Sequence, residues 1–415
     1  MLNHLRELGV FRTHIGEDYF GLSLSKTESL KLVELLSNFP WLGTYMIKNH
    51  ILPIEIIDKH GTDSQKLQYY PKIMSGDIIP TICIQEGTPG NALEVLMQYL
   101  KPGQQNISGQ AISILRNFLN ILIPDIIQMK HFDRDLYKFD LVKRLLGKMT
   151  FSLYTMESMA YLTSGMIDEY KDMDADVEKT ITETYCANNC LKCIQTGLQL
   201  VGARSYMNNQ SYIDAFHDAM ALTTIDMNNL DSNTYAAVSV FKFLGESMRD
   251  HVIKKRNSFE FPVYNIFDKI FDKYMTKLHA SKYLHPTFSQ AGLCMEDSIN
   301  KLKGGILVLF EQNGTKIVEQ YTDMMRITNM LTEIYAMFAN LTRASRSYCI
   351  GARNADLEKD LVIKMTFVSH IKISTIRSEI DSTSVFNGDK LYSDVMDFVY
   401  EKHKYPLAHP LTKTF

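Results

Sequence analysis

Three cysteines lie close enough in sequence to hold one metal cluster. Cys186, Cys190 and Cys193 have the spacing C-x3-C-x2-C, which can hold three irons of a four-iron cluster, as in radical enzymes that use S-adenosylmethionine. Such ligands need a loop that wraps the metal, whereas residues 187–200 have a helical pattern. Free cysteine is also a good small core residue. The sequence therefore predicts that these side chains pack in a core, and we expect no metal.

The other residue types that carry chemistry are scattered along the chain. His60, His131 and His217 lie in separate segments, and we interpret each as a local hydrogen-bonding or surface residue. The chain has no H-E-x-x-H zinc motif, no G-x-S-x-G nucleophile elbow and no phosphate loop. Gly304 and Gly305 lack the strand–turn–helix context of a dinucleotide fingerprint. Residue types and spacing alone thus identify no active site.

Length, composition and charge narrow the class of protein. The 415 residues predict two or three domains. A hydrophobic share of 45% and a charged share of 22% are typical of an ordinary soluble globular protein. The net charge of −3 gives no field that would attract nucleic acid, so we expect no nucleic-acid partner. With only 21 glycines and 11 prolines, the chain favours long helices over many short strands.

No stretch approaches the roughly 20 apolar residues that a membrane-spanning helix needs. The most apolar run, residues 118–127, is interrupted by Asn120, Pro124 and Asp125. The first eleven residues have a helical pattern and resemble neither a signal peptide nor a transit peptide. We therefore expect either a cytosolic protein or a targeting segment outside this chain. Six cysteines in 415 residues are too few to indicate a disulfide-stabilised fold, and this number is typical of a protein in a reducing compartment.

Helical periodicity dominates the elements that must position any site. Apolar residues recur at intervals of three and four from Val142 to Ala160 and again over residues 327–341. A third stripe, residues 191–201, stops near Gly202, which is suited to cap a helix. The best β-type run is residues 78–84. These patterns predict a mostly α fold with one short strand segment.

Several segments resemble the very-long-chain branch of the acyl-CoA dehydrogenase family. Residues 5–11 and 16–22 resemble the family's LKELGLFG…PEEYGGLG opening, and residues 61–76 resemble its GTEEQKEKYLPKLASGE segment. Residues 156–166, MESMAYLTSGM, and residues 343–347, RASRS, are nearly verbatim for this branch. The matching segments occur in the same order as in the family, and both ends of the chain match. The resemblance covers nearly the whole chain except a junction near residues 93–106.

This resemblance implies an N-terminal helical domain, a middle β domain, a C-terminal helical bundle and a further helical domain that holds this branch to the mitochondrial inner membrane. The junction is too short for the β domain, which in the family contacts the flavin ring. We therefore expect a truncated N-terminal helical domain at residues 1–93, a junction at 94–107 in place of the β domain, the bundle at 108–250 and the helical extension at 251–415. Family enzymes use FAD to remove a proton and a hydride from an acyl-CoA, and an electron-transfer flavoprotein takes the electrons.

The position of the family's catalytic base is altered. The family's RDTRILLIFEGTNE aligns with residues 217–230 and places Asp226 where the family has its glutamate base. Aspartate is one methylene shorter, and a misplacement of ~1 Å can cost ~100-fold in rate. Met227 replaces the adjacent glycine, which in the family lets cofactor and thioester approach closely. Other branches carry the base at a position near Gly103 here, which offers no carboxylate.

A glycine-rich turn that meets the flavin phosphates in the family is also altered. The family's QILGGLGY aligns with residues 199–206, where Gln199 and Gly202 are retained. Two further glycines are replaced by Ala203 and Ser205. Without those glycines, backbone N–H groups close less easily on a pyrophosphate. The alternative is that Arg204, in the same turn, supplies a charge instead.

The second flavin-contact motif has lost its charge. The family's NRTQFG aligns with residues 128–133, so that Met129 stands in place of the phosphate-pairing arginine, while Phe132 is retained. By resemblance the cofactor would be FAD, held by the residual set Phe132, Gln199 and Gly202.

The sequence leaves three interpretations open. The first is a non-catalytic scaffold, because the helices that build the family's dimer are retained while the redox site is altered in three places. One family member also serves as an assembly factor for respiratory complex I, so the resemblance implies complex I assembly proteins as partners of a homodimer. The second is an FAD-dependent long- or very-long-chain acyl-CoA dehydrogenase with Asp226 as base. Only under this second interpretation would the chain bind acyl-CoA. The third is an isoform or fragment of a longer protein.

The resemblance also implies a location. It places the protein in mitochondria, on the matrix side of the inner membrane, although we identify no transit peptide in this chain. We expect membrane contact to be peripheral at most, around residues 306–321, because that stretch has few lysines or arginines.

Overall fold

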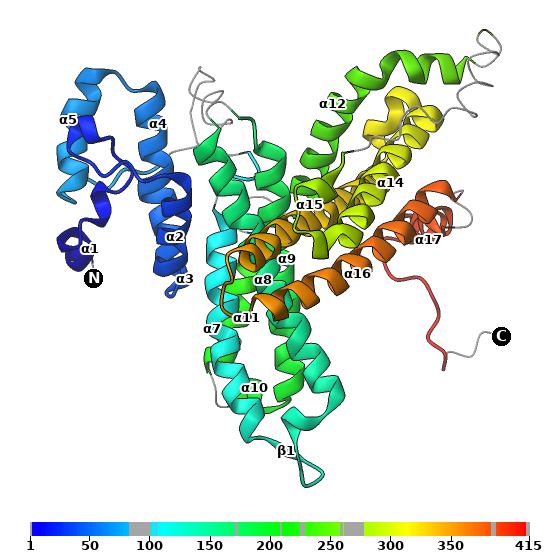
Figure 1. Ribbon diagram of the computed structural model, residues 1–415, viewed down its shortest axis with the longest axis horizontal. Helices are drawn as coiled ribbons and strands as arrows, with labels where there is room; N and C mark the ends of the chain where they lie inside the picture. Colours follow the sequence, from blue (N-terminus) through cyan, green and yellow to red (C-terminus); the bar gives the residue numbers. More distant parts are fainter. Residues whose placement is uncertain are drawn as a thin grey trace.

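A computed structural model shows a mostly helical molecule with three groups of helices (Figure 1). A group of short helices lies on one side, long helices form a central bundle, and a third group extends from the bundle on the other side. The structure describes residues 2–82, 101–104, 106–170, 173–207, 210–224, 229–257, 260, 278–382 and 387–411. The mostly α fold predicted from the sequence is confirmed.

The first group contains short helices, and side chains cap two of those described, α2 and α5. The group includes α1 (Leu2–Glu7), α2 (Lys26–Leu36), α3 (Pro40–Met46), a π-helical turn (Ile47–Ile51), α4 (Leu52–His60) and α5 (Asp63–Met74). In α2 the hydroxyl of Ser25 accepts from the Glu28 N–H while the Glu28 carboxylate accepts from the Ser25 N–H. Thr62 and Gln65 form the same capping box at α5. The predicted helix at the start of the chain is confirmed as α1.

The β-type run at residues 78–84 is not a strand where the structure describes it. Residues 78–82 have no strand partner, and residues 83–84 lie outside the described residues. Pro80 has no N–H to donate to a ladder. Ile78 and Ile82 instead pack against the apolar surfaces of the N-terminal helices. The strand prediction is wrong for residues 78–82, because their apolar side chains cover helices rather than a sheet.

The described residues contain no middle β domain. Residues 75–106 are all that connects α5 to α7 (Ile107–Gln128). The described part of this connection contains no strand. Within the described residues, the one sheet is a hairpin after α7, made of β1 (Lys130–His131) and β2 (Arg134–Asp135).

The central bundle is built on long helices with one apolar face each. After α7 it contains α8 (Asp140–Glu169), α9 (Asp176–Val201), α10 (Arg204–Met207), α11 (Gln210–Ala221) and α12 (Asn229–Arg256). The stripe predicted from residue 142 is confirmed, because Val142, Met149, Met156 and Ala160 are buried on α8. The stripe over residues 191–201 lies on α9, which ends at Gly202 as expected.

Helix α7 is the most apolar element of the bundle. By length and composition it is able to cross a membrane, which the sequence expectation missed because polar residues interrupt the run. In this fold 56% of its apolar window is buried, and residues such as Ile112, Leu115 and Leu122 are fully enclosed. Helix α7 thus serves as the core helix of the bundle.

The third group extends the bundle, and its described elements from residue 289 onward are four helices and one turn. They are α14 (Ser289–Asn313), a 3-10 turn (Gly314–Glu319), α15 (Tyr321–Cys349), α16 (Ala355–Asp381) and α17 (Asp389–Lys402). The stripe predicted over residues 327–341 forms the buried face of α15, with Ile327, Met330 and Leu341 enclosed. Phe338 departs from this pattern, because it is 38% exposed. Helix α15 packs against α14, α16 and α8 and so ties the extension to the bundle.

Candidate functional site

Phe132 lies at the tip of the hairpin between β1 and β2. Its side chain is 95% exposed. Phe132 and Asp133 both have positive φ, of 52° and 59°, in the tight turn that joins the strands. The hairpin therefore presents the aromatic ring to solvent rather than to a cavity of this chain.

Gln199 and Gly202 lie together at the end of α9. Gln199 is exposed, and Gly202 has a φ of 70°, which favours glycine. The Gly202 N–H donates to the Leu198 carbonyl at 2.9 Å. The Gly202 carbonyl accepts from the Ser205 N–H at 3.0 Å and from the Ser205 hydroxyl at 2.8 Å. The Gly202 and Ser205 N–H groups are thus already bonded within the chain.

Met129, at the position of the family's phosphate-pairing arginine, is half-buried against the apolar core of the bundle. A pyrophosphate site needs a cationic side chain and backbone N–H groups that are free to donate. Met129 and the bonded N–H groups of Gly202 and Ser205 therefore do not supply the phosphate contacts that the resemblance implies, and the cation in this turn is the exposed Arg204. Asp226, the predicted position of the base, lies outside the described residues.

The three spaced cysteines are core residues, as predicted. Cys186 and Cys190 are fully buried on α9, and Cys193 is 6% exposed. Burial raises the pKa of the Cys193 thiol to about 11, and it raises that of Cys186 and Cys190 as well. Thiols that resist ionisation are poor nucleophiles and poor metal ligands. Among the described residues, no group of three His, Cys, Asp or Glu side chains is arranged to hold a metal.

The strongest polar feature of the described chain is a buried ion network centred on Glu34 of α2. Glu34 is 2% exposed. Its carboxylate accepts from the Tyr161 hydroxyl at 2.5 Å, from Lys31 at 2.9 Å and from the Arg116 guanidinium. Burial opposes ionisation, but these hydrogen bonds outweigh it and lower the pKa of the Glu34 carboxyl.

The network continues from α7 through α8 to the extension. Arg116 of α7 also donates to Glu157 of α8 at 2.7 Å. The other oxygen of Glu157 accepts from Arg343 of α15 at 3.1 Å. Arg343 lies over the ring of Tyr154 at 3.9 Å, and the Tyr154 hydroxyl donates to Glu358 of α16 at 3.1 Å. One continuous set of charges therefore joins the N-terminal helices, the bundle and the extension.

Sequence reasoning did not find this network. The segments that contain Glu157 and Arg343 were singled out only as family motifs, and Glu34 lies outside every quoted motif. The three residues are separated by more than 120 positions each. A helical stripe shows which residues face inward, but it does not show which distant helix they meet.

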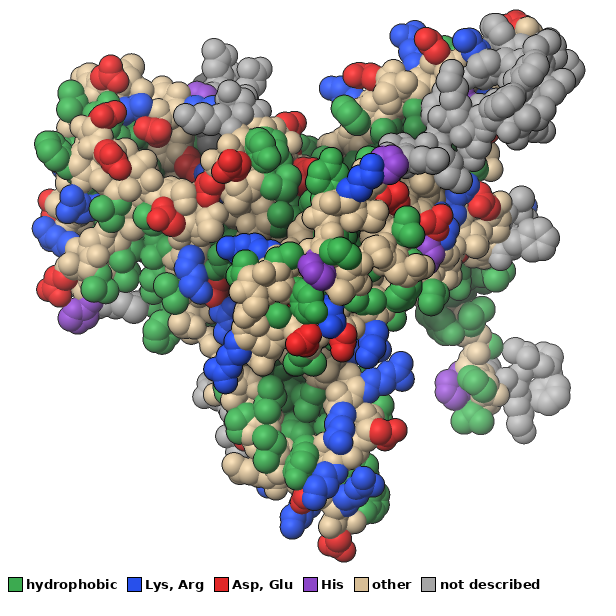
Figure 2. Space-filling view, in the orientation of Figure 1, with side chains coloured by type: hydrophobic (Ala, Val, Ile, Leu, Met, Phe, Trp, Pro, Cys, Tyr) green, Lys and Arg blue, Asp and Glu red, His purple; other side chains and the backbone are tan. Residues whose placement is uncertain are grey.

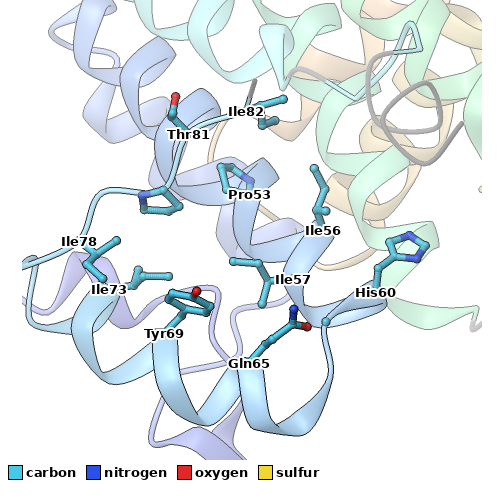
Figure 3. Close-up of a pocket in the computed structure, with 12 residues that line it drawn as sticks. Pro53, Ile56, Ile57, His60, Gln65, Tyr69, Ile73, Ile78, Thr81 and Ile82 are labelled. Atoms are coloured by element: carbon cyan, nitrogen blue, oxygen red, sulfur yellow. The ribbon is translucent and has the colours of Figure 1, made fainter. Parts of the chain in front are cut away.

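Two apolar cavities lie away from the flavin-contact positions. One, of about 510 Å³, lies between α4, α5 and residues 78–82 (Figure 3). Ile56, Ile57 and Tyr69 point into it from the two helices. A second, of about 530 Å³, lies between the start of α9 and helices α14 and α15. Neither cavity is lined by Phe132 or Gln199.

Three family models match this chain in the order that the fold shows. They are "Acyl-CoA dehydrogenase, N-terminal domain" at residues 1–77, "Acyl-CoA dehydrogenase, C-terminal domain" at 91–226 and "ACAD9/ACADV, C-terminal domain" at 286–405. The chain belongs to the acyl-CoA dehydrogenase family. Only residues 78–90 separate the first two matches, which agrees with a family member that lacks the middle β domain.

Curated relatives of this family member are distant. The mitochondrial very long-chain specific acyl-CoA dehydrogenases of Macaca fascicularis and Homo sapiens are 20% identical over 282 residues, which is 66% of this chain and 43% of each relative. The chain thus matches less than half the length of these relatives. A (2S)-methylsuccinyl-CoA dehydrogenase of Cereibacter sphaeroides is 37% identical over 90 residues, which is 21% of this chain and 16% of that protein.

Solved structures of the family share the fold. An acyl-CoA dehydrogenase from Bacillus anthracis, complexed with FAD, matches with a TM-score of 0.73 and 12% identity. That match covers 98% of this chain and 86% of the other. The family and this FAD-bound neighbour imply FAD as the family's cofactor.

Proposed function

We propose that this chain is a non-catalytic scaffold of the acyl-CoA dehydrogenase family, related to its very-long-chain branch. The observation that carries the proposal is the environment of Met129, whose side chain packs on the bundle core where the family places an arginine. An arginine pairs with phosphate through several charge-assisted hydrogen bonds, and methionine offers none. The bonded turn at Gly202 adds a second obstacle to a pyrophosphate.

The short connection between α5 and α7 supports the same proposal. In the family the middle β domain contacts the flavin ring and covers the acyl chain. Here residues 75–106 replace that domain. Hydride transfer needs a closely held donor and acceptor, and water must be kept from the site. A chain without that covering domain is poorly suited to this chemistry.

The ion network explains why a scaffold would keep the helical domains. Glu34, Arg116, Glu157 and Arg343 link three helix groups through buried or half-buried charges. Buried ionic groups specify one arrangement of elements, because any other arrangement leaves a charge without its partner. A protein that acts through its shape depends on such a fixed arrangement.

We also propose that the scaffold is a homodimer in mitochondria, at the matrix side of the inner membrane, with respiratory complex I assembly proteins as partners. The mitochondrial names of the relatives support the location. The complex I partners are proposed from the family resemblance, which the match to the ACAD9/ACADV domain extends to residues 286–405. Figure 2 shows a strip of hydrophobic side chains on the lower half of the bundle, with lysines and arginines beside it and at the lower tip. Ile123, Ile127 and Leu141 are 38%, 54% and 59% exposed in the described structure. Such an apolar surface is typical of a protein–protein contact.

Flavin absorbance tests whether the scaffold is non-catalytic. We expect the purified protein to be colourless, with no flavin spectrum, whereas a very-long-chain relative prepared in parallel is yellow. Anaerobic addition of a long-chain acyl-CoA should change nothing. Stoichiometric FAD that bleaches with the acyl-CoA would instead identify an FAD-dependent dehydrogenase with Asp226 as the candidate base.

Affinity capture from mitochondria tests the proposed partners. We expect the tagged chain to retain complex I assembly proteins. The double variant Ile123→Asp/Ile127→Asp should retain fewer, because it places charge on the apolar end of the bundle. Recovery of no such protein with the unaltered chain would overturn the assembly role but would leave the flavin result unaffected.

A further inference from the structure

A cationic groove runs along the outer side of α12. It has a volume of about 1000 Å³ and lies between α12, the end of α14 and the turn that follows it. Phe241 and Phe310 form its floor, with ring centroids 5.7 Å apart. Lys242, Arg249 and Arg256 line it from α12, and a further lysine lines the opposite wall. No carboxylate is among the described residues that line the groove.

The cations of α12 repeat at an interval of seven residues. Lys242, Arg249 and Arg256 therefore lie on one face, about 10 Å apart along the helix axis. Val238, Gly245 and Val252 repeat at the same interval beside them, and all three line the groove. An apolar row beside a charged row, both at seven-residue spacing, is the pattern that receives a second helix.

The spacing selects the kind of partner. A single carboxylate or phosphate group is able to meet only one of these cations. Successive cations are two helical turns apart, so a partner that meets several of them must carry its negative charges at the same spacing. In the middle of the apolar row, the Phe310 ring of the same chain lies 3.4 Å from where a Cβ of Gly245 would be, so this ring extends the apolar surface there. The groove therefore fits an amphipathic helix with carboxylates on one side of its apolar face.

Helix α17 of the same chain has that character. Leu391, Val395 and Phe398 recur at helical spacing and are 63%, 45% and 46% exposed. Asp394 and Glu401 are seven residues apart beside them. No residue of α17 is buried, so its apolar face is uncovered in the described structure.

Helix α17 does not occupy the groove of its own chain. Its first residue, Asp389, is held at the start of α15 by two hydrogen bonds from Arg326, at 2.7 and 2.9 Å. From there α17 lies at the edge of the molecule (Figure 1). Its 14 residues span about 20 Å, and the groove-lining face of α12 from residue 238 to 256 spans about 27 Å. The groove is long enough to hold the whole of α17.

Resting on the homodimer proposed above, we propose that its two copies associate by placing α17 of each copy in the α12 groove of the other. Asp394 and Glu401 then meet two consecutive cations of the row, and the Leu391 face covers the row of Val238 and Val252. A reciprocal exchange of this kind forms a closed pair with two identical contacts. The contact does not depend on whether the bundle binds flavin.

Two charge-reversed variants of the full chain test this contact. The groove variant is Lys242→Glu/Arg249→Glu, and the helix variant is Asp394→Lys/Glu401→Lys. We expect each variant alone to self-associate at least tenfold more weakly than the unaltered chain in sedimentation velocity. We expect an equimolar mixture to regain association, because each groove then meets a helix of opposite charge. A Lys72→Glu/Lys364→Glu variant, with the same change of charge on exposed lysines outside the groove, should associate normally.

Several results would overturn the proposal. One is unchanged self-association of both variants with helical circular dichroism intact. Another is a mixture that fails to regain association. Binding of the unaltered chain, but not the groove variant, to phosphatidylcholine–phosphatidylserine vesicles, with self-association unchanged by the substitutions, would assign the groove to a lipid surface instead.

Discussion

At the scale of single residues, Glu34 and His50 are both buried but differ in their hydrogen bonding. Glu34 satisfies three donors in a site with almost no solvent access. His50 is 1% exposed, and neither of its ring nitrogens has a hydrogen-bond partner. The charged Glu34 carboxylate is stable in this site because each of its partners donates a hydrogen bond to it. The unpartnered His50 ring is tolerated because it is neutral.

Replacing Glu34 should destabilise the protein strongly. Glu34→Gln keeps the shape but removes the charge that Arg116 and Lys31 meet, and breaking a buried pair typically costs about 3 kcal/mol. We expect urea unfolding to show a loss of that order at pH 7. The loss should shrink at pH values below the ordinary range of a carboxyl pKa, because the folded-state pKa of Glu34 is lowered and its contribution disappears as it becomes protonated. Glu17→Gln, at an exposed site, should change nothing; equal effects of the two substitutions would contradict the network.

The buried histidines should make stability depend on pH. Burial lowers the pKa of His50 from 6.5 to about 3 and that of His14 to about 4. The unfolded chain therefore binds more protons than the folded chain between these values and 6.5, so stability falls as the pH falls through that window. From pH 7 to pH 5 each histidine should cost about 2 kcal/mol. His50→Phe should remove about half of this dependence in urea unfolding at the two pH values, and exposed His4→Phe should leave it unchanged. An unaltered slope in His50→Phe would refute the account.

At the scale of elements, close helix contacts depend on small residues. Gly197 of α9 faces α7, and a Cβ there would lie 2.4 Å from Phe118 and 3.0 Å from Leu122. Gly165 of α8 has open space around it. The two glycines are therefore in similar helices but in opposite packing situations.

Substituting these glycines should separate packing from helix propensity. Gly197→Val should overpack the contact between α7 and α9 and lower the free energy of unfolding by about 1–3 kcal/mol. Gly165→Ala should raise it by up to about 1 kcal/mol, because alanine favours the helix and meets no neighbour. Thermal unfolding followed by circular dichroism measures both. A neutral Gly197→Val would show that α7 and α9 are not closely packed at this position.

Helices and their buried faces were predictable from the sequence, whereas the contacts between distant helices were not. The helices and their buried stripes were predicted because periodicity is local, as Met149 and Met156 on α8 show. The run at residues 78–82 was misread as a strand, because branched apolar residues are typical of strands and equally able to cover helices. The pairing of Glu34 with Arg116 and of Glu157 with Arg343 was not predictable, because it depends on which helices meet in space. For the candidate site, the sequence identified the altered flavin-contact positions, but only the structure shows Met129 packed on the core.

At the scale of the whole molecule, the fold keeps the family's helical groups and lacks the domain that lies between them. The ion network and α15 hold these groups in one arrangement. Phe132, on an exposed hairpin, and Gln199, on an exposed helix end, remain at the surface. The scaffold role proposed above would use this surface and shape and would need no bound flavin.

Titration of the purified chain with FAD tests this central claim most directly. Equilibrium dialysis against increasing FAD should show no saturable binding, and the visible spectrum of the retained flavin should match that of free FAD. Met129→Arg should not restore binding, because the connection at residues 75–106 still lacks the family's β domain. One FAD bound per chain, with a perturbed spectrum that bleaches anaerobically on addition of a long-chain acyl-CoA, would contradict the account.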